Sequence, residues 1–204
     1  MHNTIIFDLG GVLIDWNPDY VFDAIFDGHP ERKKYFYENI CTPHWNEEQD
    51  AGRTLQAATD LLLDEHPEWQ DEIKAYYGRW EEMLGGAIEG TVDIFKELKA
   101  SGKYRIYALT NWSAETFPVA LDKFEFLQWF DGIVVSGTEM TRKPFPEFYQ
   151  ILLDRYSVAP SDAVFIDDNL RNVEAARGMG IASIHFHSPE RLREELASLD
   201  VLAS

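Results

Sequence analysis

The stretch Thr4-Ile5-Ile6-Phe7-Asp8-Leu9-Gly10-Gly11-Val12-Leu13 decides the fold of this chain. It opens with a short run of large apolar residues, which is typical of a strand buried on both faces of a parallel sheet. The strand is predicted to end at one carboxylate, Asp8. Gly10 and Gly11 follow, and they permit a tight turn and a close approach of the backbone to a ligand. Because ligands bind at the carboxyl ends of strands in open α/β sheets, Asp8 is predicted to lie where the chemistry takes place.

The segment from residue 15 to residue 89 is predicted to be helical and is strongly acidic. Apolar residues recur there at helical spacing in three groups: Tyr20, Val21, Phe22, Ile25 and Phe26; Leu55, Ala58, Leu61 and Leu62; Ile73, Tyr76, Tyr77, Trp80 and Leu84. Gly85-Gly86 marks a flexible return near its end. A block of helices between the first strand and the next predicts a cap inserted over residues 15–89.

Helices and short strands alternate from Gly90 onward. Strands are predicted over residues 104–109, 132–135, 163–166 and 181–186, and helices begin at Thr91, near 113–118, at Pro146, at Asn169 and at Ser188. This alternation predicts a parallel sheet with right-handed crossovers. The predicted fold class is therefore α/β: a Rossmann-like parallel sheet from residues 1–14 and 90–204, with the helical cap inserted.

Composition limits the partners of this 204-residue chain. Its net charge of −18 argues against nucleic acid and against anionic membranes. Cys41 is the only cysteine, so no intrachain disulfide can form and a reducing compartment fits. No apolar run approaches the length that spans a bilayer, and the amino terminus has no basic signal region. We expect a cytoplasmic monomer or homodimer that acts on a small phosphorylated metabolite, for the reasons that follow.

Carboxylates follow two of the predicted strands. Asp8 ends the first strand, and Asp167-Asp168 ends the strand over residues 163–166. The ends of parallel strands lie on one edge of the sheet, so these three groups are expected to converge. Three carboxylates at one point repel one another unless a cation lies among them. Oxygen ligands in this number suit Mg²⁺, and the sequence predicts a magnesium site.

Polar residues that suit a phosphate group follow two other strands. Thr110 and Asn111 end the strand over residues 104–109, and Lys143 lies in the loop after the strand over residues 132–135. Thr110 offers a hydroxyl, Asn111 a backbone amide near a helix start, and Lys143 a point charge. Together with the carboxylates they predict a site for a phosphorylated ligand.

Four motifs in this order resemble the haloacid dehalogenase superfamily, over nearly the whole chain. They are Phe7-Asp8-Leu9-Gly10-Gly11-Val12, Leu109-Thr110-Asn111, Lys143-Pro144 and Phe165-Ile166-Asp167-Asp168-Asn169. The insert after the first strand is similar to the superfamily's cap. The first motif looks like the Asp-x-Gly-x-Val pattern of a subgroup that includes glucose-1-phosphate phosphatases.

The resemblance implies an Mg²⁺-dependent phosphatase in which Asp8 attacks phosphorus in line and forms an aspartyl-phosphate. The implied metal ligands are Asp8, the carbonyl of Gly10, Asp168 and, directly or through water, Asp167. The residues implied to hold the phosphoryl oxygens are Thr110, Asn111 and Lys143. Water then hydrolyses the acyl phosphate.

The chain departs from the family's pattern at Gly10. Phosphatases of the superfamily usually carry a second aspartate there, which protonates the leaving group and later activates water. Such a group typically contributes ~10²–10⁴ in rate. Its loss is compatible with substrates that have good leaving groups, such as sugar 1-phosphates, or with an acid from elsewhere. The substitutes considered are Asp15, His44, Glu47 and Asp50.

Two other functions remain open on the sequence. In a dehalogenase, Asp8 would displace halide from a 2-haloacid without a metal and without a leaving-group acid. The intact Asp167-Asp168 pair argues against this, because that branch needs no metal. Gly10 also differs from the tyrosine that the dehalogenase branch typically has at this position. A domain that binds a phosphorylated ligand without turnover is the third hypothesis, and the intact Asp8 and Lys143 argue against it.

Contacts to the organic part of the substrate are predicted from residues near the cap hinge and in a polar cap loop. Trp16 could line the mouth of the site or pack between cap and core. Trp45 could stack on a sugar ring or pack within the cap, and Arg53 could hold an anionic group. Gly10 and Gly11 would approach the ligand with their backbone. The acidic cap predicts a small substrate with one phosphate and an otherwise neutral structure.

Overall fold

A five-stranded parallel sheet forms the centre of the computed structural model, which describes residues 2–202. Its strands are β1 (Thr4–Phe7), β4 (Arg105–Thr110), β5 (Gly132–Val135), β6 (Ala163–Asp167) and β7 (Ala182–His185). The strand order is β5-β4-β1-β6-β7, so β1 lies in the middle. Phe7 is in register with Ile166, which places Asp8 level with Asp167 at the carboxyl edge. The predicted α/β sheet is confirmed.

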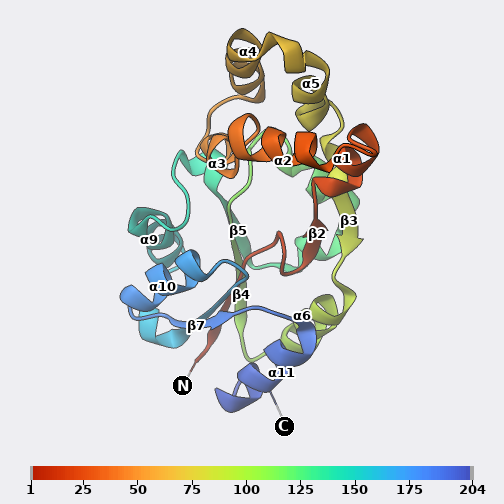
Figure 1. The fold of residues 1–204 in the computed structure, drawn as a ribbon. Helices are drawn as coiled ribbons and strands as arrows, with labels where there is room; N and C mark the ends of the chain where they lie inside the picture. Colours follow the sequence, from red (N-terminus) through yellow and green to blue (C-terminus); the bar gives the residue numbers. More distant parts are fainter. Residues whose placement is uncertain (1, 203–204) are drawn as a thin grey trace.

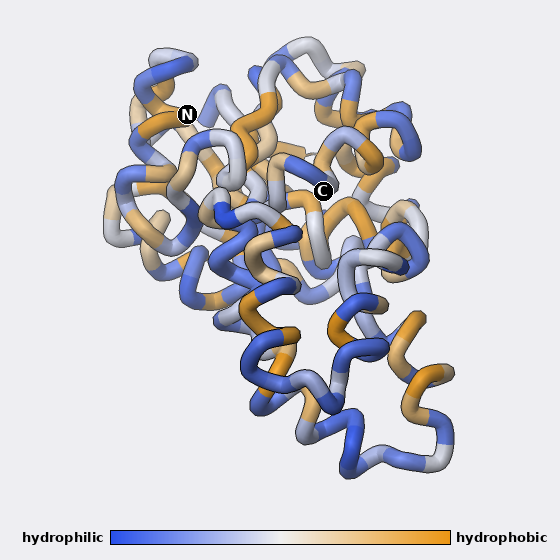
Figure 2. Tube along the Cα trace, turned by 90° about the horizontal axis from the view of Figure 1, so that it is seen from above, coloured by the Kyte–Doolittle hydropathy of each residue, from blue (hydrophilic) through white to orange (hydrophobic). Residues whose placement is uncertain are grey.

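Helices cover both faces of this sheet. α6 (Glu89–Ala100) and α11 (Pro189–Ser198) lie on one side, and α9 (Pro146–Arg155) and α10 (Leu170–Gly178) lie on the other (Figure 1). The shorter helices α7 (Phe117–Lys123) and α8 (Ser136–Glu139) follow β4 and β5. The helices carry alternating hydrophobic and hydrophilic stretches, as expected for helices with one face on the core (Figure 2).

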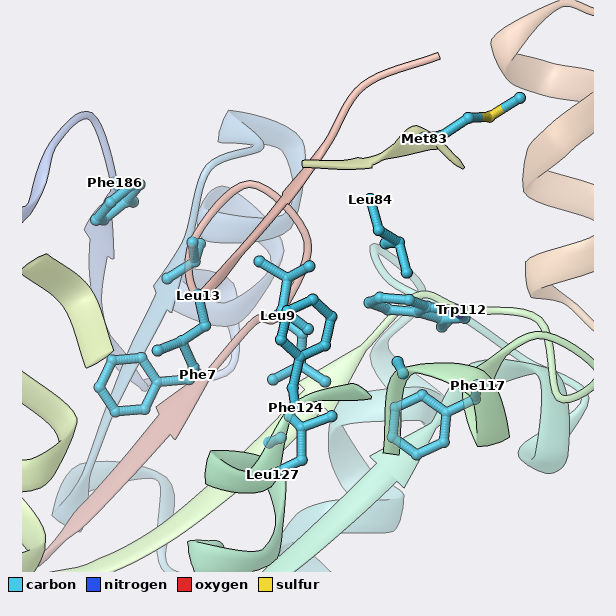
Figure 3. Close-up of a cluster of buried hydrophobic side chains, with 14 of the residues drawn as sticks. Phe7, Leu9, Leu13, Met83, Leu84, Trp112, Phe117, Phe124, Leu127 and Phe186 are labelled. Carbon is cyan, nitrogen blue, oxygen red and sulfur yellow. The ribbon is translucent and has the colours of Figure 1, made fainter. Parts of the chain in front are cut away.

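Two hydrophobic clusters hold these layers together, one on each face of the sheet. Ile5 and Phe7 belong to the larger cluster, whereas Ile6 packs with residues of α9. This alternation follows from the period of two in a strand. Leu9, just after Asp8, lies in the larger cluster beside residues that follow β4 (Figure 3). Since Phe7 and Leu9 are both fully buried, packing fixes the backbone on either side of Asp8.

The insert forms a helical group on the carboxyl side of the sheet, and we call residues 15–89 the cap. Its helices are α1 (Asp19–Ile25), α2 (Pro30–Asn39), α3 (Pro43–Asp50), α4 (Leu55–Glu65) and α5 (Gln70–Gly78). They lie beyond an antiparallel ribbon of β2 (Ile14–Trp16) and β3 (Leu84–Ala87), which leads the chain out of the core and back (Figure 1). Short 3₁₀ helices span Pro67–Trp69, Trp80–Met83, Glu125–Trp129 and Pro160–Asp162.

The ribbon corrects the predicted end of the third cap helix. Leu84 was expected on that helix, but α5 ends at Gly78 and Leu84 begins β3. Gly85 lies in this strand, and only a glycine fits there, because a Cβ would collide with the carboxylate of Asp15. The Gly-Gly pair therefore serves strand pairing as well as the return of the chain.

The start of α6 also differs from its prediction. Thr91 was expected to cap this helix, but the helix begins two residues earlier, at Glu89. Thr91 is fully buried, so its hydroxyl faces the interior and not the helix end. Within residues 2–202, no helix has the length and apolar character needed to cross a membrane.

Candidate active site

Asp8 lies at the carboxyl end of the central strand and is held through both backbone and side chain. Its backbone NH donates a hydrogen bond of 2.8 Å to the carbonyl of Ile166. Its Oδ1 accepts a hydrogen bond of 2.7 Å from the NH of Leu9 and lies 2.9 Å from Nζ of Lys143. Only 7% of Asp8 is exposed, on the side of the cavity that it lines. Oδ1 is therefore engaged, and Oδ2 accepts none of the hydrogen bonds formed within residues 2–202.

Lys143 bridges two carboxylates although it is completely buried. Its Nζ lies 2.9 Å from Oδ1 of Asp8 and 2.6 Å from Oδ2 of Asp167. Its backbone is held by the side chain of Asn111, whose Oδ1 accepts from the Lys143 NH at 2.8 Å and whose Nδ2 donates to the Lys143 carbonyl at 2.9 Å. The side chain of Asn111 thus positions the lysine loop.

Asp167 anchors this lysine from a fully buried position. Besides Lys143, it accepts a hydrogen bond of 2.8 Å from the NH of Asn169 and bonds of 3.1 Å on each oxygen from Nδ2 of Asn172. Asn172 was not predicted as a site residue. It is a buried polar residue on α10, and a polar residue on the inner face of that helix is the signal that could have identified it.

The charges in this cluster shift one another. Burial raises the pKa of Asp8 well above its ordinary range, and Asp167 and Asp168 raise it further, whereas Lys143 opposes the shift. Burial also raises the pKa of Asp168. For Lys143, burial lowers the pKa, but the charges of Asp167 and Asp8 outweigh burial and the net pKa is raised. Three carboxyl groups thus lie near one lysine, and their mutual repulsion disfavours ionising all three without a further cation.

The carboxylates have the arrangement that a hard divalent cation requires. Asp8, Asp167 and Asp168 each offer an oxygen, and these oxygens all lie within 4.8 Å of one another. Gly11 lies against Asp168, with φ of +75°, and a Cβ at this position would collide with that carboxylate. The glycine thus makes room for the third carboxylate. Oxygen donors, excess negative charge and one exposed member fit Mg²⁺.

Thr110 places a buried hydroxyl without a partner among the described residues at the carboxyl end of β4. It ends β4, the strand that pairs with β1, and it is fully buried. Its Oγ1 has no hydrogen-bond partner within the described part of the chain. Because a buried hydroxyl without a partner is costly, this atom favours a polar ligand beside it.

A cavity of about 210 Å³ opens in front of Asp8, between the sheet edge and the cap. The predicted site residues that line it are Asp8, Gly10, Gly11, Trp16, Asn111 and Asp168. The residues not predicted as contacts are Asn46, Tyr77, Trp80, Trp112, Ser113 and Thr116. Trp112 and Ser113 directly follow the Thr110-Asn111 motif, which could have signalled them. The cap residues Asn46, Tyr77 and Trp80 are brought to the cavity by tertiary packing, so no motif near them in sequence could have signalled them.

Two of the predicted substrate contacts, Trp45 and Arg53, have partners within the cap. Trp45 is 6% exposed, and its Nε1 donates to the carbonyl of Ala58 at 3.2 Å. Arg53 donates to Oε1 of Gln49 at 2.7 Å and to the carbonyl of Trp45 at 2.8 Å. Neither residue is among those that line the cavity. Both are occupied in bracing α3 within the cap, which is the alternative considered for Trp45.

Two of the four substitute acids, Asp15 and His44, lie outside this cavity. The carboxylate of Asp15 accepts a hydrogen bond from the hydroxyl of Tyr20. His44 is exposed near the start of α3. Neither is among the residues that line the cavity.

The other two lie one turn apart on α3. Glu47 forms ion pairs with core residues, at 3.0 Å to Nη2 of Arg142 and also to Arg171. Asp50 is half-buried and lines the cavity together with Asp8. Burial raises the pKa of Asp50 to about 7. Of the four, only Asp50 reaches the site.

The sequence matches the profile of one protein family over most of its length. The haloacid dehalogenase-like hydrolase profile covers residues 2–180. The chain is 28% identical over 201 residues to drimenol cyclase drtB of Aspergillus calidoustus, across 98% of this chain and 37% of the cyclase. It therefore spans little more than a third of that relative.

A second relative and a solved structure have similar length. The chain is 27% identical over 194 residues to sesquiterpene phosphatase astK of Aspergillus oryzae, across 88% of this chain and 87% of the phosphatase. HAD family enzyme bt-2542 of Bacteroides thetaiotaomicron, solved with magnesium and inorganic phosphate, superposes with a TM-score of 0.68. That match has 21% identity and covers 92% of this chain and 96% of the enzyme. It shows that the two share a fold.

Proposed function

Because the chain belongs to the haloacid dehalogenase-like hydrolase family, we propose that it is a Mg²⁺-dependent phosphatase of small phosphomonoesters. The observation that carries this proposal is the buried Lys143, which lies between Asp8 and Asp167 with a third carboxylate close by. A nucleophile, a cation and a divalent-metal site at one point are what phosphoryl transfer requires. The sesquiterpene phosphatase relative, which this chain matches over most of its length, supports the same reaction class.

Asp8 is the proposed nucleophile. Because the Leu9 NH and Lys143 both hold Oδ1, the carboxylate is fixed in orientation and Oδ2 is left to attack phosphorus. The new bond joins Oδ2 to phosphorus while the bond from phosphorus to the ester oxygen breaks. Attack by water on phosphorus then releases phosphate and restores Asp8.

Lys143 and Thr110 are proposed to hold the phosphoryl oxygens. Lys143 is charged, fully buried and fixed at both ends, so it needs no reorganisation during the reaction. The buried hydroxyl of Thr110 would gain in the phosphoryl group the partner that it lacks. Asn111 acts through its two hydrogen bonds to Lys143 and is a positioning residue.

The residues that would hold Mg²⁺ are Asp8, Asp168, the carbonyl of Gly10 and, through water, Asp167. The oxygens of Asp167 already accept hydrogen bonds from Lys143, Asn169 and Asn172, which favours an indirect role. When bound, the ion offsets the charge of the carboxylates and of the phosphoryl oxygens. The division into a core of residues 1–14 and 90–204 and a cap of residues 15–89 belongs to the same proposal.

The substrate is proposed to carry one phosphate on a neutral organic group with an apolar face. Four aromatic side chains line the cavity: Trp16, Tyr77, Trp80 and Trp112. They would stack on a sugar ring or pack against a hydrocarbon. The Asp-x-Gly-x-Val motif favours sugar 1-phosphates, and the sesquiterpene phosphatase relative favours prenyl-type phosphates as a second group to test.

The test is phosphate release from a panel of sugar 1-phosphates, prenyl phosphates and aryl phosphates, with Mg²⁺ and with EDTA. We expect turnover with Mg²⁺ that EDTA abolishes and that Asp8→Asn lowers by ~10⁴–10⁶-fold, as for other lost nucleophiles. Chloride release from 2-haloacids in EDTA, without any phosphate release, would instead establish the dehalogenase hypothesis. Binding of inorganic phosphate without turnover of any ester would establish the binding domain.

A further inference from the structure

The proposed reaction lacks a proton for its leaving group. When an alkyl ester is cleaved, the departing oxygen carries a negative charge that an acid must neutralise. Gly10 has no side chain to provide this proton. Lys143 is held by two carboxylates whose charges raise its pKa, so it is a poor proton donor. The acid must therefore come from another part of the cavity wall.

The cavity wall offers few titratable groups among the described residues. Besides Asp8 and Asp168, which are assigned to the nucleophile and the metal, they are Tyr77 and Asp50. The Tyr77 hydroxyl donates to Oδ1 of Asn46 at 2.9 Å and accepts from Gln49 at 2.8 Å. Burial raises the pKa of Tyr77 further above neutrality. Tyr77 is thus a poor proton donor, and Asp50 is left.

We propose that Asp50, which the cap brings to the cavity, is the catalytic acid that protonates the leaving oxygen. This inference rests on the proposed phosphatase function. In the first step the proton of Asp50 passes to the ester oxygen as its bond to phosphorus breaks. In the second step the Asp50 carboxylate takes a proton from the water that attacks the aspartyl-phosphate. Asp50 therefore ends the cycle protonated, as it began.

Contacts between α3 and the core hold Asp50 in place. Glu47, one turn earlier on the helix, pairs with Arg142 and Arg171 of the core. Gly52, two residues later, lies so close to Met140 that a Cβ there would collide with its sulfur. The end of α3 is thereby fixed on both sides of Asp50. No ion pair or side-chain hydrogen bond within residues 2–202 engages Asp50 itself, so its carboxyl group is free to exchange a proton.

The surroundings of Asp50 suit an acid that works near neutral pH. Burial raises its pKa to about 7, and Glu47 raises it while Arg142 and Lys143 lower it. The charged and titratable groups that face it are Glu47 on α3, Arg142 and Lys143 in the loop after α8, and Tyr76 and Tyr77 on α5. An acid whose pKa lies near the working pH can both give and take a proton.

The position of Gly10 offers an independent way to test this assignment. Gly10 lines the cavity, and a Cβ built there meets no atom within 4 Å. Its φ is not in the left-handed region, so a side chain is tolerated. The variant Gly10→Asp would thus place a carboxyl group on the opposite, core side of the same cavity.

The experiment compares kcat/KM for a series of phosphate monoesters whose leaving groups range from p-nitrophenol to simple alcohols. For Asp50→Asn we expect a loss of ~10²–10³-fold on alkyl phosphates, within the usual range for a general acid, and only a few-fold loss on p-nitrophenyl phosphate. The alkaline limb of the pH profile near 7 should disappear in this variant. Adding Gly10→Asp to Asp50→Asn should raise kcat/KM on alkyl phosphates at least tenfold above the value of Asp50→Asn alone.

The matched control is Asp64→Asn, which removes an exposed carboxylate from α4 of the same cap and should leave all rates unchanged. An equal loss on every ester, or an unchanged alkaline limb in Asp50→Asn, would overturn the assignment of Asp50 while the wild type still turned over. Absence of turnover by the wild type on all esters would instead overturn the phosphatase proposal and this inference with it.

Discussion

The cavity has two walls that differ in how their polar groups are paired. On the sheet wall, Asp8 lines the cavity and forms an ion pair with the fully buried Lys143, which in turn pairs with the buried, hydrogen-bonded Asp167. On the cap wall, aromatic rings such as Trp80 line the cavity together with one carboxyl group, Asp50, which has no ion-pair partner among the described residues.

This difference indicates a division of labour between the two walls. Groups that are held by several partners keep their geometry while charge moves, which suits the phosphoryl group. A carboxyl group without partners can gain and lose a proton, which suits the leaving oxygen. The predictions below are ordered by expected effect, and each could remove the distinction between the walls or make it sharper.

Removal of Lys143 should have the largest effect, because it removes the cation that pairs with two buried carboxylates. Lys143→Met leaves the buried carboxylates of Asp8 and Asp167 without their counter-charge. We expect a loss of ~3–5 kcal/mol in the free energy of unfolding without metal, measured by urea denaturation. The phosphatase rate should fall by about 10²–10³-fold. Lys123→Met, which removes an exposed partner of Glu81, should change neither quantity.

Stabilisation of the protein by metal should depend on the carboxylates of the sheet wall and not on Asp50 of the cap wall. Because Asp8, Asp167 and Asp168 repel one another, we expect saturating Mg²⁺ to raise the free energy of unfolding by ~2–3 kcal/mol and EDTA to reverse the gain. Thermal unfolding of Asp168→Asn should show a much smaller response, and Asp50→Asn a response equal to that of the wild type. Equal responses from Asp168→Asn and the wild type would place the metal elsewhere.

On the cap wall, the titration of Asp50 should make the free energy of unfolding depend on pH. The pKa of Asp50 is about 7 in the folded protein, against ~3.9 for an unfolded aspartate, so the folded state binds this proton more tightly. Its contribution to stability is therefore lost as the pH rises from about 4 to about 7. Asp50→Asn should remove this loss and be more stable than the wild type at pH 8 by ~1–2 kcal/mol. Urea titrations at pH 5 and pH 8 measure the difference, with Asp64→Asn as the control.

Tyr77 should matter least, because its hydroxyl serves the cap and not the reaction. Tyr77→Phe breaks the hydrogen bonds with Gln49 and Asn46, at an expected cost of ~1 kcal/mol in the free energy of unfolding. Its kcat should fall by no more than a few fold on any ester, with the pH profile unchanged. A loss that grew with the pKa of the leaving group would move the acid from Asp50 to Tyr77.

The same two walls separate what could be predicted from the sequence from what could not. Asp8, Thr110 and Asp167 lie at the carboxyl ends of strands, and the topology of a parallel sheet brings strand ends to one edge whatever else the chain does. Their convergence was therefore predictable, as was the α/β fold. Lys143 was found from its place in the loop after another strand.

The cap wall depends on packing that local patterns do not encode. Trp45 and Asp50 lie on the same short helix, yet the first packs inside the cap and the second lines the cavity. The face of α3 that meets the core carries Glu47, whose partner Arg142 is far away in sequence. Spacing alone could not distinguish these faces, so Trp45 was predicted as a contact and Asn46 was not.

The most direct test of the account is to trap the covalent intermediate. Enzyme with Mg²⁺ is mixed with a turned-over phosphomonoester, quenched in acid within milliseconds, digested and analysed by mass spectrometry. The account predicts a phosphoryl group on the peptide that contains Asp8, present in the wild type, absent in Asp8→Asn and formed more slowly from alkyl phosphates in Asp50→Asn. Phosphate release at an unchanged rate by Asp8→Asn, or a phosphoryl group on another residue, would contradict it.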